Sequence, residues 1–166
     1  MSIDNNVSYQ FYKKYHQNKI NKIIHILCIP LIVWSFSVLL NSFVFNIGLT
    51  FNNIQQDISY NFNFNIYLSF ILLSQYLLFY TIIDINSFIP MFILLYFIWI
   101  TSYYFFISSQ YPYYYSLIIN VFSWIMQFIG HGIFEGNRPA LMDSIKQAFL
   151  MAPLFTYYEL KQLITM

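Results

Sequence analysis

Long apolar runs alternate with short polar segments along this chain. Four runs are long enough, or nearly so, to cross the hydrocarbon core of a bilayer, which takes roughly 20 helical residues. They cover approximately residues 23–49, 66–83, 88–107 and 114–134. The pattern therefore predicts an all-α, multi-pass membrane protein with four transmembrane helices, folded as a single membrane-embedded domain over residues 1–166.

The polar segments between these runs predict the connections. The Asn-rich stretch at 50–65 is expected to be a polar loop, and residues 84–87 a tight turn. Residues 108–112 are expected to form another turn, followed by the tyrosines of an aromatic belt at the membrane interface.

The region after the fourth run has a different character. Gly136 predicts a helix stop, and Pro139 suits the first turn of a new helix. Apolar residues then recur at helical spacing through 139–164, with Pro153 interrupting the pattern. The apolar stretch is too short to cross a bilayer, so interfacial or re-entrant C-terminal helices are predicted.

The composition supports a membrane location. The chain is 59% hydrophobic and 8% charged, with a mean hydropathy of +0.58, whereas an ordinary soluble domain is about 25% charged. The net charge of +1 and the lack of a basic cluster with interleaved aromatics indicate no nucleic-acid partner. Cys28 is the single cysteine, so a buried, inert thiol is favoured over a disulfide or a cysteine metal site.

Lysine and arginine are confined to the two ends of the chain, and this distribution predicts the orientation. The positive-inside rule places both termini in the cytosol, which requires an even number of spans and agrees with four. The polar N-terminal segment favours a retained signal-anchor over a cleaved signal peptide. The cations are Lys13, Lys14, Lys19, Lys22, Arg138, Lys146 and Lys161.

This topology brings the three histidines of the chain to one membrane face. His16 and His25 flank the start of the first span, and His131 lies in the last turn of the fourth. Glu135 follows His131 by four residues and is expected to project from the same helical face. Ionisable groups at membrane depth are candidates for function, and two histidines with a carboxylate are the common non-haem Fe(II) pattern. The candidate metal ligands are therefore these three histidines and Glu135, flanked by glycines at 130 and 132 that permit close backbone approach.

One geometric constraint applies to the first two histidines. His16 and His25 are nine residues apart, which is about 180° around a straight helix. They can share a metal only if the helix is broken between them. Asn18 and Asn21 are plausible break and N-cap residues, and Asn21 would then share a face with His25.

Each of these residues also has an interpretation without a metal. An interfacial histidine is commonly a hydrogen-bonded amphipathic side chain, and Glu135 could be a solvated partner of Arg138. The alternative function is therefore a non-enzymatic membrane scaffold or lipid-binding protein with structural histidines. A small transporter or channel is disfavoured, because the spans show no polar stripe through the bilayer centre. The spacing of the histidines does not name the metal.

Two stretches of the chain resemble a known family. The first runs from Phe11 to Pro30 with the pattern Phe-Tyr-x-x-Tyr-His-x-Asn-x-x-Asn-x-x-x-His-x-x-x-x-Pro. The second is Trp-Ile-Met-Gln-Phe-Ile-Gly-His-Gly-Ile-Phe-Glu at 124–135, followed by Arg-Pro-Ala-Leu at 138–141, Asp143, Ala-Pro at 152–153 and Glu159. Both are similar to the fungal 2-hydroxy-palmitate dioxygenases, long catalogued as a domain of unknown function. Spans two and three match that family only in hydrophobicity.

The resemblance implies an Fe(II)-dependent enzyme of the endoplasmic reticulum membrane. Such an enzyme shortens a long-chain 2-hydroxy fatty acid by one carbon with O2, in the α-oxidation that degrades phytosphingosine. His16, His25 and His131 match the family's histidines and are the implied catalytic residues.

Substrate contacts are a further hypothesis. Arg138 is the candidate partner of the substrate carboxylate, with snorkelling toward lipid phosphate as its alternative role. Asn21 and Gln127 are candidates for orienting substrate or metal ligands. Asp143 and Glu159 are equally compatible with pairing to neighbouring Lys or Arg. The acyl tail is expected to lie between the spans, with its head at the interface.

Overall fold

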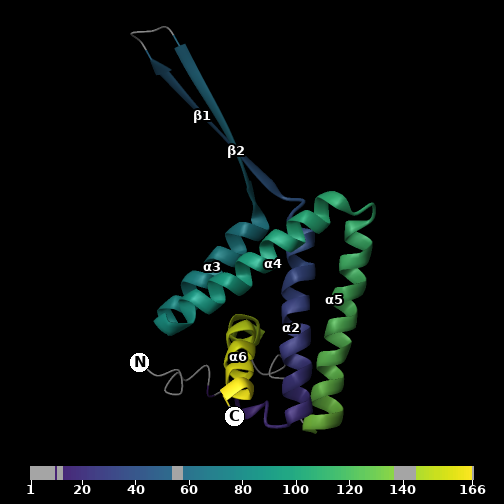
Figure 1. The fold of residues 1–166 in the computed structure, drawn as a ribbon. Coiled ribbons are helices and arrows are strands. Elements are labelled where there is room, and N and C mark those ends of the chain that lie inside the picture. Colours follow the sequence, from purple (N-terminus) through teal and green to yellow (C-terminus); the bar gives the residue numbers. More distant parts are fainter. Residues whose placement is uncertain (1–9, 11–12, 54–57, 137–144, 166) are drawn as a thin grey trace.

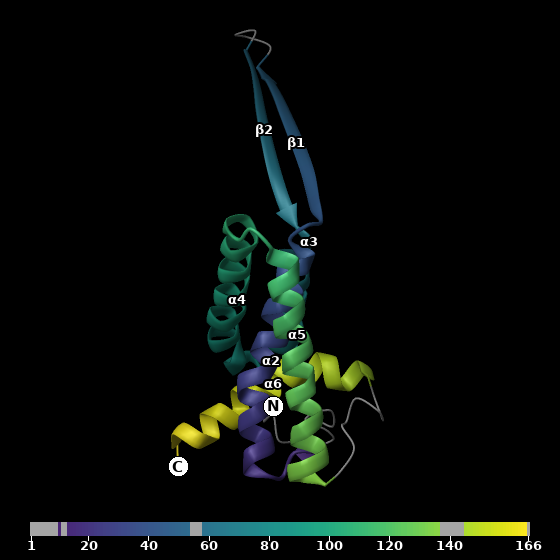
Figure 2. The same cartoon turned by 90° about the vertical axis from the view of Figure 1, so that its right-hand side faces the viewer.

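The computed structural model describes residues 10, 13–53, 58–136 and 145–165, with side chains omitted at 50–53, 58–62, 145–148 and 165. Two upright helices, α2 and α5, run side by side, and α3 and α4 form a pair tilted across them (Figure 1). Helix α6 crosses the bundle near the end where α2 begins (Figure 2). A β-hairpin projects from the opposite end (Figure 1).

Helix α2 spans Lys19–Leu40 and begins at a side-chain cap. The Asn18 side-chain oxygen accepts hydrogen bonds from the backbone N–H of Ile20 at 2.8 Å and of Asn21 at 3.4 Å. Because these N–H groups have no partner inside the helix, an asparagine here stabilises the helix start. The predicted break between the first two histidines is therefore confirmed, with Asn18 as its N-cap.

The end of α2 corrects the first predicted span. That span was expected to continue to residue 49, but α2 ends at Leu40 and a strand, β1, occupies Val44–Asn53. From Val44 onward apolar and polar residues alternate with a period of two, and this pattern suits a strand better than a helix. Asn41 and Ser42 precede it, and both favour a helix end over a helix interior.

The second correction concerns the Asn-rich region, whose described residues, 50–53 and 58–65, form strands instead of the predicted loop. Strand β2, Ile58–Tyr67, pairs with β1 in an antiparallel hairpin, with Phe45 opposite Ile66 and Asn46 opposite Asn65. The asparagines alternate with apolar residues, so they occupy one face of a ribbon instead of forming a continuous polar coil. The protein is thus mainly helical, with one hairpin that an all-α prediction missed.

The remaining connections follow the predicted turns. Helix α3, Leu68–Ile83, is joined to α4, Phe88–Ser108, by the single 3-10 turn η2, Ile85–Ser87. Helix α5, Pro112–Ile129, follows after three residues with proline in its first turn. It continues into a π-helical segment, η3, that is described below.

Three helical segments of the described chain are long and apolar enough to cross a membrane: Lys19–Leu40, Ile85–Ser108 and Pro112–Glu135. Helix α3 is apolar but has only 16 residues. Its length is about 24 Å at 1.5 Å per residue, short of a hydrocarbon core of about 30 Å. Four spans, and with them the cytosolic termini, remain predictions.

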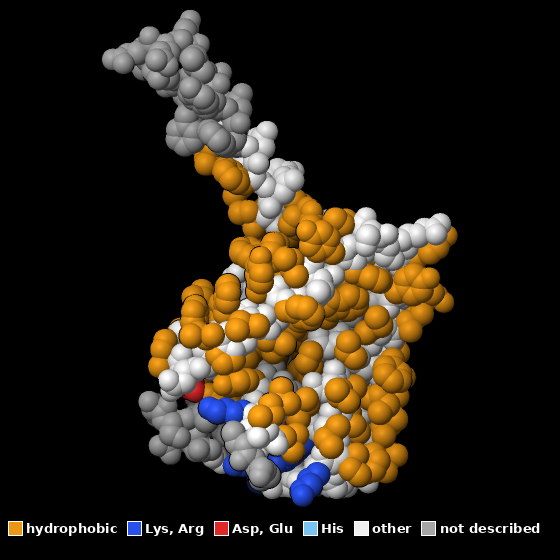
Figure 3. Space-filling view, in the orientation of Figure 1, with side chains coloured by type: hydrophobic (Ala, Val, Ile, Leu, Met, Phe, Trp, Pro, Cys, Tyr) orange, Lys and Arg blue, Asp and Glu red, His pale blue; other side chains and the backbone are white. Residues whose placement is uncertain are grey.

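The surface of the bundle agrees with a membrane environment. Apolar side chains cover most of the visible face, and the Lys side chains seen on it gather at the end where α6 lies (Figure 3). Large apolar residues stand more than 60% exposed on several helices, including Leu27, Leu78 and Ile93. In water such a surface would be unfavourable, whereas against lipid tails it has no cost.

Helix α6, Ile145–Thr165, packs an apolar face against α3 and α4. Its helix runs through Pro153 without the predicted interruption, and residues 139–144 of the predicted C-terminal helices lie outside the described residues. Two polar contacts fix α6 further. Tyr158 donates a hydrogen bond to Asp84 before η2, and Glu159 forms an ion pair with Lys22 of α2 at 2.9 Å.

Candidate metal centre

The three histidines converge at the end of the bundle where α2 begins. The Nε2 atoms of His16 and His25 lie 2.8 Å apart, and those of His25 and His131 lie 3.2 Å apart. One ligand nitrogen from each ring can be chosen so that all lie within 4.8 Å of one another. The side chains are 0%, 2% and 3% exposed, in that order. The predicted convergence of the histidines is thus present, inside the protein.

Each imidazole comes from a different segment. His16 lies in the chain just before α2, on the far side of the Asn18 cap. His25 lies one turn inside α2. His131 belongs to η3, the π-helical segment Gly130–Glu135 that continues α5 and ends at Gly136 with a φ of +68°. The predicted helix stop at Gly136 is confirmed. A π turn accommodates an extra residue, is rare, and occurs frequently at functional sites.

Helix α6 closes the cluster from the remaining side. The ring of Phe155 lies 5.0 Å from the ring of His16, centroid to centroid, and is fully buried. Phe155 also belongs to the core formed with α3 and α4. The imidazoles are therefore enclosed by α2, η3 and α6, and this exclusion of water suits both metal ligation and reactive chemistry.

A backbone carbonyl sets the tautomer of His25. Its Nδ1 lies 2.9 Å from the carbonyl oxygen of Asn21, one turn earlier. A carbonyl oxygen can only accept, so Nδ1 carries the proton and donates. The lone pair of His25 is then on Nε2, directed at the other two histidines. Metal-binding histidines are commonly oriented in this way.

The donor set fits a single metal ion. The one lone pair on His25 Nε2 can accept one hydrogen bond, yet two Nε2 atoms lie within 3.2 Å of it. An ion bound at the zinc–imidazole distance of about 2.0–2.1 Å places nitrogens at right angles about 3 Å apart. The separations of His25 Nε2 from the Nε2 atoms of His16 and His131 are close to that spacing. Three neutral imidazoles suit Fe, Zn, Cu or Ni, and the geometry does not choose among these metals.

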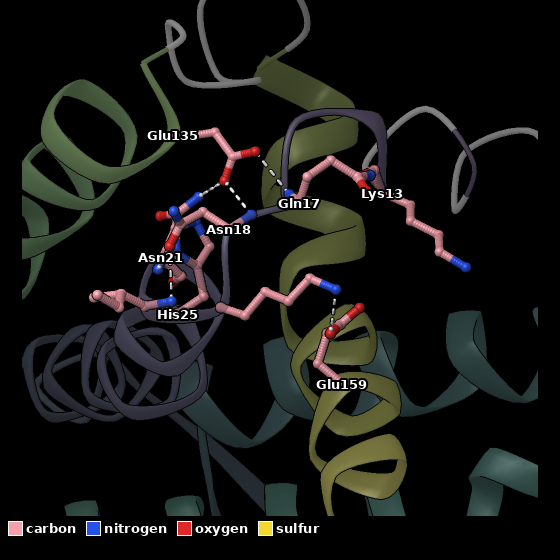
Figure 4. Close-up of polar contacts among 9 residues, drawn as sticks. Lys13, Gln17, Asn18, Asn21, His25, Glu135 and Glu159 are labelled. Carbon is pink, nitrogen blue, oxygen red and sulfur yellow. Dashed lines mark hydrogen bonds and ion pairs between the residues drawn. The ribbon is translucent and has the colours of Figure 1, made fainter. Parts of the chain in front are cut away.

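Glu135 lies outside this histidine cluster, although it was a candidate ligand from its spacing. Its Oε1 accepts a hydrogen bond from the backbone N–H of Gln17 at 2.7 Å. Its Oε2 accepts from the backbone N–H of Asn18 at 3.0 Å and from Nδ2 of Asn21 at 2.9 Å (Figure 4). Both carboxylate oxygens are thus engaged by the start of α2, and among the residues that the structure describes the group of possible ligands here consists of the three histidines.

One of the two glycines beside His131 has a clear steric role. A Cβ added to Gly130 would lie 2.4 Å from Oδ1 of Asn21, far inside contact distance. At Gly132 nothing lies within 4 Å of an added Cβ. The close approach of α2 to η3 therefore requires glycine only at position 130.

Comparison with known proteins agrees with the motifs. The model of the family described as "2-hydroxy-palmitic acid dioxygenase Mpo1-like" matches residues 4–164. The chain belongs to this family. A relative in Saccharomyces cerevisiae, named 2-hydroxy-palmitic acid dioxygenase MPO1, is 30% identical over 151 residues, which cover 90% of this chain and 75% of the yeast protein. No solved structure matches the chain.

The structure describes some of the other predicted site residues of this Mpo1-like chain and not others. Gln127 is buried one turn before His131, and its Nε2 has no hydrogen-bond partner among the described residues. Asn21 is fully buried between Glu135 and Gly130. Arg138, the candidate carboxylate partner, lies outside the described residues, as does Asp143. Glu159 pairs with Lys22, as its alternative interpretation predicted.

Helix α5 carries a polar stripe, although the spans were expected to carry none through the bilayer centre. The stripe packs against α2, where Asn120 Nδ2 donates to Ser35 Oγ at 2.9 Å. Its spacing of four, three, four and four residues follows one helical face and was visible in the sequence as a repeat. The stripe ends at the histidine cluster and consists of the half-buried Asn120 and the buried residues Ser116, Ser123, Gln127 and His131.

Proposed function

We propose that this protein is an Fe(II)-dependent dioxygenase that converts a long-chain 2-hydroxy fatty acid into the fatty acid one carbon shorter. The observation that carries the proposal is the convergence of three buried imidazoles from three segments, in a chain of the Mpo1-like family. The yeast relative named 2-hydroxy-palmitic acid dioxygenase supports the substrate class.

The overall reaction balances with one O2. A 2-hydroxy acid, R–CH(OH)–COOH, and O2 give R–COOH, CO2 and H2O. The bond between C1 and C2 breaks, and the substrate loses four electrons, which reduce O2 without another reductant. When bound, Fe(II) supplies the reactivity toward O2, because ground-state O2 reacts poorly with closed-shell organic molecules.

The residues of the chain have separable roles in this proposal. His16, His25 and His131 hold the iron and leave positions on it open. Gln127 offers a buried Nε2 donor one turn from His131, suited to the 2-hydroxyl or a carboxylate oxygen of the substrate. Arg138 is proposed to pair with the carboxylate. Asn21 holds the start of α2 and fixes the His25 tautomer through its carbonyl.

The membrane explains how such a substrate reaches the site. A long acyl chain partitions into the bilayer, gaining about 0.8 kcal/mol for each CH2 removed from water. We propose that the tail lies between the helices while the head reaches the metal cluster near the interface. We also propose the endoplasmic reticulum membrane as the location and phytosphingosine degradation as the source of substrate.

Metal content tests the proposal. The full-length protein, purified in detergent and reconstituted with Fe(II) without oxygen, is expected to hold near-stoichiometric iron by mass spectrometry. His131→Ala should lose it, because one of three ligands is removed. Ser116→Ala, which truncates another buried polar side chain of α5, is the control and should keep the metal. Iron-loaded protein should then consume 2-hydroxypalmitate and O2 in equal amounts.

The opposite result is equally informative. If wild-type protein binds no iron even after anaerobic reconstitution, the dioxygenase mechanism fails for this chain. The histidines would then be structural, and a membrane scaffold or lipid-binding protein would be the better description.

A further inference from the structure

Glu135 joins the three segments that carry the histidines. Its own backbone belongs to η3, as does that of His131. Its carboxylate binds the N–H groups of Gln17 and Asn18, the two residues that directly follow His16. It also binds the side chain of Asn21, whose carbonyl orients His25. Figure 4 shows the carboxylate facing the turn before α2 and the first turn of that helix.

The chemistry of this contact requires an ionised carboxylate. All three groups that face Glu135 are N–H donors, and none is an acceptor. A carboxylate accepts hydrogen bonds at both oxygens, whereas a glutamine would place an NH2 donor against at least one of these N–H groups. The positive end of the α2 dipole favours the same negative charge.

We propose that Glu135 is a positioning residue that latches the His16 segment onto α2 and η3, so that the three imidazoles are set before a metal binds. His16 needs such a latch because it lies outside α2, in a segment whose direction the helix does not determine. The inference rests on the proposed function, since the latch matters to the reaction only if the histidines hold a metal.

The affinity of the protein for a metal, measured without any substrate turnover, tests whether Glu135 positions the histidines. Co(II) is the probe, because its visible absorption bands report the number and arrangement of ligands. In full-length, detergent-purified protein, Glu135→Gln should weaken Co(II) binding by about 10–100-fold, the usual effect of removing a group that orients a ligand. Its Co(II) bands should also change in position and intensity, as expected if His16 no longer ligates.

A matched substitution separates this role from a general loss of stability. Glu159 is another buried carboxylate that contacts α2, but it does so through an ion pair with Lys22. It accepts no hydrogen bond from the N–H groups that bind Glu135. Glu159→Gln should therefore keep the wild-type Co(II) spectrum, even if it lowers the unfolding temperature. If Glu135→Gln also keeps the wild-type spectrum and affinity, Glu135 does not position the ligands and the proposal is overturned.

A second readout needs no metal. Trypsin should cleave the metal-free Glu135→Gln protein after Lys13, Lys14 or Lys19 several-fold faster than metal-free wild type, because the segment is released. Unchanged cleavage would contradict the latch.

If Glu135→Gln does not fold, Asn21→Ala is the second variant. It removes one of the three hydrogen bonds to the Glu135 carboxylate and should give smaller changes in Co(II) binding and in trypsin cleavage. If Asn21→Ala changes neither, the proposal is overturned.

The metal-binding and trypsin experiments distinguish a failure of the proposed function from a failure of the proposed role of Glu135. Wild-type protein that binds neither Fe(II) nor Co(II) would refute the proposed function, while the trypsin comparison would still decide whether Glu135 latches the segment. Wild-type protein that binds metal, with Glu135→Gln indistinguishable from it, would refute the latch alone.

Discussion

At the scale of single residues, the contact between Gly130 and Asn21 controls how closely η3 approaches α2. The Oδ1 atom of Asn21 occupies the space that any Cβ at position 130 would need. The same asparagine donates from Nδ2 to Glu135 and fixes His25 through its carbonyl. Glycine at position 130 thereby permits two orienting contacts, from Asn21 to Glu135 and from Asn21 to His25.

The two glycines beside His131 provide a matched pair of substitutions. Gly130→Ala should destabilise the protein by about 1–3 kcal/mol, the usual cost of overpacking a close contact, and weaken metal binding by displacing Asn21. Gly132→Ala should be neutral or slightly stabilising, because the site is open and alanine favours helix. Thermal unfolding in detergent measures both. Equal effects of the two substitutions would mean that the close approach at Gly130 is not required.

At the scale of elements, α6 is fastened to the bundle by polar contacts at both sides of its apolar face. Tyr158 reaches Asp84 beside the α3–α4 turn, and Glu159 reaches α2. Burial raises the pKa of Asp84, but hydrogen bonds from Tyr158 and from the backbone and side chain of Asn86 outweigh it, leaving the pKa below its ordinary value. The ionised form of Asp84 therefore stabilises the folded state.

This contact predicts a pH dependence of stability. A carboxyl group whose folded pKa is depressed contributes its stabilisation above its unfolded pKa, about 3.9 for aspartate, and loses it as the pH falls through the folded pKa. Tyr158→Phe removes the hydrogen bond from the tyrosine. The unfolding temperature of wild type should exceed that of Tyr158→Phe at neutral pH, and the difference should shrink below about pH 4. A difference that is constant across pH would show that the tyrosine acts by packing alone.

At the scale of the whole molecule, the start of α2, where the histidine cluster lies, and the hairpin are at opposite ends of the bundle (Figure 1). On the face shown in Figure 3, the Lys side chains gather at the end where α6 crosses. If that end faces the cytosol, as the positive-inside rule predicts, the hairpin extends into the lumen.

N-glycosylation tests this orientation. Gln55→Thr creates the acceptor sequence Asn-Ile-Thr at 53–55, beginning at the last residue of β1. In endoplasmic reticulum membranes the variant should gain one glycan at Asn53, seen as a mobility shift that a glycosidase reverses. The natural Asn-Val-Ser at 6–8 should stay unmodified, because the N-terminus is predicted to be cytosolic. Glycan at 6–8 and none at Asn53 would invert the topology.

The features that the sequence determined by itself depend on local residue patterns or on composition. Apolar runs predicted membrane helices, since a helix in lipid must satisfy its own backbone and present apolar side chains. The cap at Asn18 and the stop at Gly136 follow from side chains acting on their own neighbourhood. Counting spans predicted that the histidines lie at one end of the bundle, and their proximity is confirmed although the four-span count is not established.

Only the tertiary structure decided which groups meet. Asn21 and Glu135 are 114 residues apart in sequence. Spacing alone made Glu135 a candidate metal ligand, whereas the structure shows its oxygens accepting hydrogen bonds from the start of α2. The hairpin was missed because asparagine signals a loop by composition, whereas its alternation with apolar residues makes one face of a paired ribbon. Local patterns record what each segment prefers. The partner of a buried polar group depends on how segments pack, because in a water-poor interior such a group must find its hydrogen bonds within the protein.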